Sequence, residues 1–146
     1  MSENTAFPVT RDRIPAVLRT AGITATPQRI EIAAVLMERP QHLSAEQVLT
    51  RLQSDDSAVS KATVYNTLKL FAERGLVREV MVDATRVFFD SNTGPHHHFY
   101  NVDDGELMDF EVGSHDFGDL PTPPEGTEAV SVDLVIRVRN LPAKDD

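Results

Sequence analysis

The chain has 146 residues, of which 40% are hydrophobic and 25% charged, a composition typical of a soluble globular protein that buries its own core. It contains no cysteine, which excludes disulfides, thiolate-bound zinc and cysteine nucleophiles. No apolar run approaches the roughly 20 residues that span a bilayer, and the first residues lack the apolar stretch of a secretory signal. We therefore expect a cytoplasmic protein without a membrane partner.

Charge is divided unevenly along the chain. The formal net charge is −9, yet residues 1–80 carry ten Lys/Arg and nine Asp/Glu, a net of +1. Residues 81–146 carry four Lys/Arg and fourteen Asp/Glu, a net of −10. Because nucleic-acid binding requires cations that neutralise phosphates, only the N-terminal half is suited to it. We predict two domains with different roles, at residues 1–90 and 91–146.

Four short helices are predicted within the first 75 residues. The first spans residues 13–21, the second begins at Pro27, the third begins in the capping-box sequence at Ser44, and the fourth spans residues 60–74. The second helix is expected to bury one apolar stripe, made of Ile30, Ala33, Ala34 and Met37.

A β-hairpin is predicted after the helices. Residues 76–82 and 86–89 alternate between apolar and polar side chains around a turn at 83–85. Helices followed by a hairpin are the order of a winged helix, in which a helix-turn-helix carries a β wing. The alternative is a mixed α+β core in which the hairpin has no special function.

The fourth helix has two distinct faces. A step of about 100° per residue places Val64, Leu68 and Phe71 on one inward face. The outward side chains suit a recognition helix, because Asn bonds adenine, Tyr and Thr contact thymine methyls or phosphates, and Lys neutralises the backbone. The candidate DNA contacts here are Lys61, Thr63, Tyr65, Asn66 and Lys69. The alternative is an ordinary solvated polar face.

The C-terminal half reads as a small sheet. Residues 98–101 and 106–110 form a predicted hairpin around 103–105, residues 113–126 form a loop, and residues 127–140 form one long strand. The strand collects its apolar side chains on one face: Val130, Val132, Leu134, Ile136 and Val138. Such a face is best buried across the two-fold axis of a homodimer.

Three of the five histidines are consecutive. In an extended strand, His96 and His98 point to one face and His97 to the other. Two imidazoles on one strand face are a chelating pair for a divalent metal such as iron, manganese or zinc.

The segments at residues 26–29, 60–68 and 75–77 resemble the ferric uptake regulator superfamily of bacterial metal-responsive repressors, over about residues 10–139. The resemblance implies an α+β fold, with an N-terminal winged helix-turn-helix domain followed by a small α/β dimerisation domain. It further implies a homodimer that binds a palindromic double-stranded DNA operator, with Arg29 among the DNA contacts. It implies no enzymatic activity.

The resemblance also implies a set of metal ligands. Carried over position by position, the set is His42, Asp90, His96, His98 and Asp109. Three imidazoles and two carboxylates suit Fe²⁺ or Mn²⁺, with Zn²⁺ able to substitute in vitro. The set resembles that of the peroxide-sensing branch, which has Asp at the position ending the wing. Taken singly, His42 is also compatible with a loop residue, Asp90 with a turn residue and Asp109 with an exposed carboxylate.

The chain departs from the family pattern in two places. Asn101 and Asp104 stand where many members have their first Cys-x-x-Cys pair, so no structural thiolate zinc is expected. A second family metal site would need a His within residues 130–134, and it is incomplete unless Asp116 and Asp133 serve. His97 is then left without an evident metal partner, and His115 is interpreted as a polar loop residue.

Further segments resemble the iron response regulator branch, which is linked to iron and haem; they are residues 88–90, 96–100, 124–126 and 135–139. The chain lacks the Cys-Pro haem motif of some members, so haem would depend on His96, His97 and His98. The predicted function is a DNA-binding regulator of iron homeostasis, tuned by metal or haem at an interdomain site. The alternatives are a non-haem iron enzyme with a His/His/carboxylate site and a metal-buffer protein that binds no DNA. Without cysteine, a peroxide response must involve the metal or methionine.

Overall fold

The computed structural model describes residues 7–93, 96–110, 120–130 and 132–143. The chain divides into two compact units, residues 1–94 and 95–146, and each is described by itself. The N-terminal unit contains the helices and one sheet, and the C-terminal unit contains a second sheet, which makes the fold α+β. Among the described residues, no helix is both long and apolar enough to cross a membrane.

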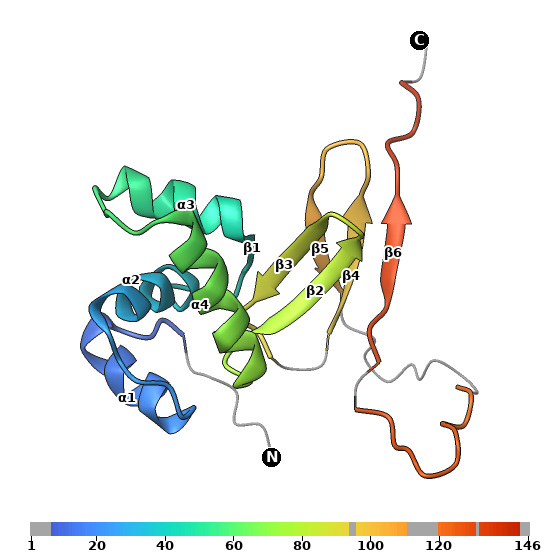
Figure 1. Ribbon diagram of the computed structural model, residues 1–146. Helices are drawn as coiled ribbons and strands as arrows, with labels where there is room; N and C mark the ends of the chain where they lie inside the picture. The colour runs from blue at the N-terminus through green and yellow to red at the C-terminus, as the bar shows by residue number, and fades with distance from the viewer. Residues whose placement is uncertain (1–6, 94–95, 111–119, 131, 144–146) are drawn as a thin grey trace. The chain divides into compact units, whose positions relative to one another are not determined.

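The N-terminal unit alternates helices with short strands (Figure 1). In chain order its elements are η1 (Arg11–Arg13), α1 (Ile14–Thr20), α2 (Pro27–Leu36), β1 (His42–Ser44), α3 (Ala45–Ser54), α4 (Lys61–Glu73), β2 (Arg78–Asp83) and β3 (Arg86–Asp90). The first predicted helix is thus shorter than expected, because residues 11–13 form a 3-10 turn ahead of α1.

Side-chain caps fix where three of the helices begin. The hydroxyls of Thr26, Ser44 and Ser60 each accept the backbone N–H of the third residue of the helix that follows. At Ser44 the Gln47 side chain returns the bond and completes the capping box. Gly75 follows α4 with φ +75°, a left-handed conformation that glycine adopts without strain. The predicted helix starts are therefore confirmed.

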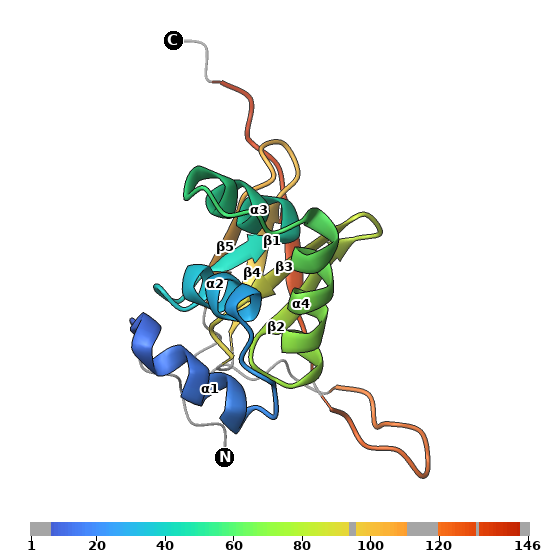
Figure 2. The same ribbon diagram turned by 60° about the vertical axis from the view of Figure 1, so that its left-hand side comes forward.

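The helices enclose the core of this unit. The predicted inward face of α4 is confirmed, because Val64, Leu68 and Phe71 are fully buried. The predicted stripe of α2 is wrong in part, since Ile30 and Ala34 are only half-buried. The buried residues of α2 are instead Ile32, Ala33, Val35 and Leu36, followed by Met37 at its C-cap. Figures 1 and 2 show the reason: α2 lies between α1 and α3 and also contacts α4, so its buried face is wider than one stripe.

The wing is a three-stranded antiparallel sheet in the order β1-β3-β2. The hairpin of β2 and β3 agrees with the predicted one. At its turn, the Asp83 carboxylate accepts the N–H and the hydroxyl of Thr85, and these hydrogen bonds hold the pKa of Asp83 below its usual value. Strand β1 was not expected, because three residues are too few for a period-two pattern.

The C-terminal unit contains β4 (His97–Asn101), β5 (Leu107–Phe110) and β6 (Val135–Val138), in the order β5-β4-β6. Strands β4 and β5 are antiparallel, and β6 pairs with β4 in parallel. The long strand predicted at 127–140 is wrong in extent, since within its described part only residues 135–138 are strand. Among the described residues, β6 pairs with β4 from Val135 to Val138, and Val130 is 95% exposed. Residues 111–119, including His115 and Asp116, lie outside the described residues.

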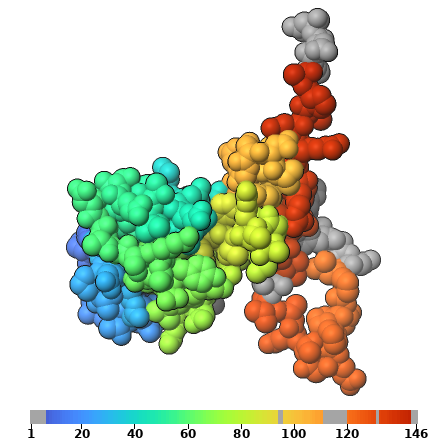
Figure 3. All heavy atoms as spheres, turned by 45° about the horizontal axis from the view of Figure 1, so that its top comes forward, coloured from blue at the N-terminus to red at the C-terminus, as the bar shows by residue number. Residues whose placement is uncertain are grey.

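A hydrogen-bonded clasp joins the β4–β5 turn to the residues after β6. The buried Asn101 side chain accepts the N–H groups of Asp103 and Asp104 and donates to Asn140 Oδ1 at 2.8 Å. The N–H of Asn140 donates to Asp103 Oδ2 at 2.8 Å. Figure 3 shows the chain after β6, in red, projecting as a single extended segment, so these bonds anchor it at its base.

Replacing Asn101 with Ala should lower the free energy of unfolding by about 1–3 kcal/mol, because two N–H groups and Asn140 lose their partner. Asn140→Ala removes fewer bonds and should cost less, and it serves as the matched control. Urea unfolding of both variants measures the difference. Equal, near-zero costs for the two variants would contradict a stabilising role for the clasp.

Candidate metal centre and nucleic-acid surface

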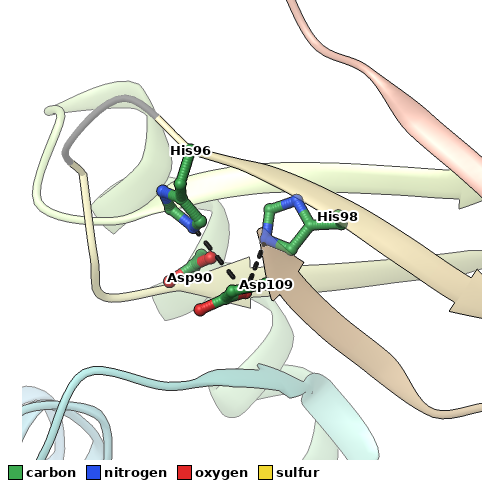
Figure 4. Close-up of side chains that lie close together, drawn as sticks. All are labelled: Asp90, His96, His98 and Asp109. Carbon is green, nitrogen blue, oxygen red and sulfur yellow. Dashed lines mark ion pairs between the residues drawn. The ribbon is translucent and has the colours of Figure 1, made fainter. Parts of the chain in front are cut away.

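Two histidines and one aspartate converge at the start of β4. His96 and His98 are each only 3% exposed, and their ring centroids lie 4.7 Å apart. Their Nε2 atoms lie 3.9 Å and 3.1 Å from Oδ1 of Asp109, the residue that faces His98 across the β4–β5 pair. Figure 4 shows both rings directed toward this carboxylate. The alternation of a strand thus places His96 and His98 on the side of one carboxylate.

The three side chains fit a divalent ion. Their ligand atoms all lie within 4.8 Å of one another. A metal held about 2.0–2.2 Å from each ligand needs neighbouring ligand atoms roughly 3.0–3.6 Å apart, so small side-chain movements suffice. The Asp109 side chain is 44% exposed, which leaves a route for an ion from solvent. Imidazole and carboxylate donors suit iron, manganese or zinc.

His97 has a different partner from its neighbours. Its Nδ1 accepts the N–H of Leu134 at 3.1 Å, so the neutral ring carries its proton on Nε2. A metal on Nε2 would require the proton on Nδ1, where the Leu134 N–H already points. While this bond is kept, His97 joins β4 to the chain that enters β6 and is unsuited to ligation.

The other two predicted ligands belong to the N-terminal unit. His42 and Asp90 are cross-strand partners in the β1–β3 pair. The Asp90 carboxylate, also drawn in Figure 4, is fully buried and accepts the N–H of Asn92 at 2.9 Å. The His42 ring meets Phe88 edge-on, with 6.1 Å between ring centroids. The predicted ligands therefore occur as a pair in one unit and a trio in the other.

Two residues beside this pair were missed by the sequence analysis. The N–H of Gln41 donates to Ser91 Oγ at 3.1 Å, and the N–H of Ser91 donates to the Gln41 carbonyl at 2.9 Å. The side-chain Nε2 of Gln41 also donates to the backbone carbonyl of Val35 at 2.7 Å. These bonds fix the ends of β1 and β3 to α2, which restrains His42 and Asp90. Neither residue carries a sequence signal beyond its place next to a predicted ligand.

The exposed face of α4 presents Tyr65 and Asn66. Tyr65 is 48% exposed, and Asn66 is also exposed. Lys61, at the first turn, has a long ion pair of 3.7 Å with Glu46, and both side chains are mostly in solvent. Such exposed pairs contribute little and are easily exchanged for another anion. These three side chains are available to a ligand.

The remaining predicted DNA contacts are held by the protein itself. The Thr63 hydroxyl accepts a hydrogen bond from Ser60 Oγ at 2.9 Å, as part of the N-terminal cap. Arg29 donates to the carbonyl of Thr24 at 2.9 Å, which orients its guanidinium without cancelling its charge. Lys69 is paired with Glu79.

Comparison with known proteins places this arrangement in context. The sequence model of the ferric uptake regulator family matches residues 20–118. The peroxide-responsive repressor PerR of Staphylococcus aureus strain Mu50 is 36% identical over 96 residues, 66% of this chain and 65% of that protein. The chain thus aligns with just under two thirds of the length of this curated relative.

Two solved structures are similar over most of the chain. The ferric uptake regulator from Pseudomonas aeruginosa with manganese has 31% identity and a TM-score of 0.64, covering 86% of this chain and 96% of that chain. The ferric uptake regulator of Vibrio cholerae has 22% identity and a TM-score of 0.69, covering 87% and 99%. At that identity the second likeness concerns the fold alone. It confirms the predicted α+β fold class.

The contrast between neighbouring histidines can be tested by metal titration. His98→Ala should abolish high-affinity Mn²⁺ binding, because it removes a buried ligand atom next to Asp109. His97→Ala should retain most of the affinity, since that ring bonds to Leu134 instead. Isothermal titration calorimetry measures both variants. Equal loss in the two would show that His97 contributes to metal binding.

Proposed function

Because the chain belongs to the ferric uptake regulator family, we propose that it is a metal-responsive transcriptional regulator, not an enzyme, which binds double-stranded DNA as a homodimer. One observation carries the proposal: the buried His96 and His98 rings share the Asp109 carboxylate in the C-terminal unit. The helical unit that precedes it presents Tyr65 and Asn66 on an exposed helix face.

For the metal, we assign one Fe²⁺ or Mn²⁺ per protomer to His42, Asp90, His96, His98 and Asp109. Only six positions separate Asp90 from His96, so the chain lets both reach one ion. When bound, the ion supplies a positive charge shared by the two carboxylates. Because the ligands come from both units, ligation favours one arrangement of the two units and of the DNA-binding helices that they carry. The manganese in the Pseudomonas aeruginosa relative supports this choice of metals.

For DNA, Asn66 and Tyr65 read base edges, while Lys61 and Arg29 neutralise phosphates and Thr63 completes the surface. A homodimer presents two copies of α4 related by a two-fold axis, so the operator is palindromic. The small positive charge of residues 1–80, in a chain of net charge −9, supports DNA contact by this half alone.

For the signal, we propose occupancy of the metal site. We also propose that the protein regulates iron homeostasis, as the resemblance to the iron response regulator branch implies. Haem is the less suitable ligand, because the Leu134 N–H occupies one nitrogen of His97. Peroxide is the second candidate, since a relative 36% identical is a peroxide-responsive repressor.

Metal-loaded protein should select a palindromic operator from a random duplex pool, and chelation should change its affinity for that operator. Asn66→Ala should lower the preference at one base position by about 1–3 kcal/mol, because a bidentate contact to adenine is lost. Fluorescence anisotropy with the selected operator and its single-base variants measures this. Tight metal binding with no operator at any metal concentration would establish a metal-buffer protein instead.

A regulator that senses metal occupancy and one that senses peroxide by histidine oxidation differ in what peroxide does to their histidines. If occupancy is the signal, Fe²⁺-loaded protein keeps its histidines unmodified under mild peroxide, and only chelation alters DNA binding. Peptide mass spectrometry checks the peptides that contain His42 and His96, with Mn²⁺-loaded protein as the control. An added oxygen on either peptide, together with lost DNA binding, would instead assign peroxide sensing.

A further inference from the structure

Lys69 connects the exposed helix face to the wing. Its Nζ lies 3.2 Å from Glu79 Oε1 on β2, and the two side chains are 42% and 27% exposed. The same Nζ lies 5.9 Å from the centroid of the Tyr65 ring, one turn earlier on α4. One ammonium group therefore contacts a carboxylate on the wing and an aromatic ring on the helix face.

The charge of Lys69 is compensated within the protein. The hydrogen bond and the charge of Glu79 raise the pKa of Lys69, and Tyr65 and Glu73 act in the same direction. A DNA phosphate that bound Lys69 would lie close to the Glu79 carboxylate, which already accepts from the same ammonium group. Like charges repel at such distances, so a phosphate contact at Lys69 is unfavourable.

Lys61 is the natural comparison on the same helix. Its partner Glu46 is 3.7 Å away, and the side chains of Lys61 and Glu46 are 72% and 80% exposed. Water therefore screens this pair, and Lys61 can turn to a phosphate at little cost. The sequence presents Lys61 and Lys69 as equivalent cations, and the structure separates them.

We propose that Lys69 is a positioning residue, which holds the Tyr65 ring and ties α4 to β2, and that Glu79 lowers the nonspecific attraction of this surface to DNA. This inference rests on the proposed DNA-binding function. It assigns to Lys69 and Glu79 a part in the preference of the α4 surface for operator over random DNA. The affinity for random DNA depends on the number of phosphates that the protein neutralises. Pairing Lys69 with Glu79 therefore lowers the affinity for random DNA more than the affinity for an operator, which also depends on base contacts.

Salt titration separates a phosphate contact from a positioning role. The 146-residue chain, loaded with Mn²⁺, is titrated with KCl on its selected operator and on a random duplex of equal length. Lys61→Gln should flatten the slope of log K against log[salt] by about 0.9 per protomer. Lys69→Gln should leave the slope unchanged and reduce the ratio of operator to random affinity. Glu79→Gln should steepen the slope by about 0.9 per protomer and raise the affinity for random DNA.

A second readout does not involve DNA. The chain has two tyrosines, and Tyr100, buried in the C-terminal unit, is the internal reference for the ring signals of Tyr65 in NMR spectra. Lys69→Gln and Glu79→Gln should each shift the Tyr65 signals and leave those of Tyr100 in place.

Salt slopes and tyrosine signals respond differently to a phosphate contact at Lys69 and to a missing DNA-binding function. A slope flattened as much by Lys69→Gln as by Lys61→Gln would overturn the inference, because Lys69 would then be a phosphate contact. Unmoved Tyr65 signals in both Lys69→Gln and Glu79→Gln would also overturn it, whether or not DNA is bound. A parent protein that prefers no operator would overturn the proposed function, while the tyrosine signals would still decide the role of Lys69.

Discussion

Successive side chains of β4 and of the residue before it point to opposite faces of the sheet, and this alternation gives three consecutive histidines different chemistry. His96 and His98 meet the Asp109 carboxylate, whereas His97 accepts the N–H of Leu134. A shift of one residue in the β4–β5 register would exchange the faces and place His97 beside the carboxylate. The metal centre and the attachment of β6 therefore depend on the same strand register.

Hydrogen bonds also fix the register of β6 against β4, in a chain without cysteine. At one end of the β4–β6 pair, the Leu134 N–H bonds to His97, and its carbonyl accepts the N–H of His98. At the other end, Asn101 joins the β4–β5 turn to Asn140. The short strand β6 is thus held at both ends by side chains of β4, His97 and Asn101. Buried polar groups with specific partners favour one register over its neighbours because a slipped register would leave them unpaired.

Charge pairing governs the N-terminal unit in a similar way. A count of cations over residues 1–80 treats every Lys and Arg as equal. In the structure Lys69 is bound to Glu79, whereas Lys61 is nearly free in solvent. These local ion pairs determine the electrostatic potential at the surface of α4, and the total charge of residues 1–80 does not describe that potential. The wing strand β2 contributes the Glu79 carboxylate to this balance, so it affects the charge of the helix face.

The sequence by itself determined the features that arise from short-range interactions. Caps at Thr26, Ser44 and Ser60 set the helix starts, and turn residues set the hairpins, because each bond joins residues a few positions apart. The spacing of His96 and His98, together with the family motifs, grouped these two histidines with Asp109, and the C-terminal unit brings the three side chains together. Their role as metal ligands stays a prediction.

Only the tertiary structure decided which distant residues meet. It pairs His42 with Asp90 across 48 positions, widens the buried face of α2 where three other helices contact it, and limits β6 to the residues that β4 can pair. It also assigns Lys69 to Glu79 and His97 to Leu134. Periodicity describes one element at a time, whereas these contacts depend on the register and packing of several elements, and no local pattern encodes them.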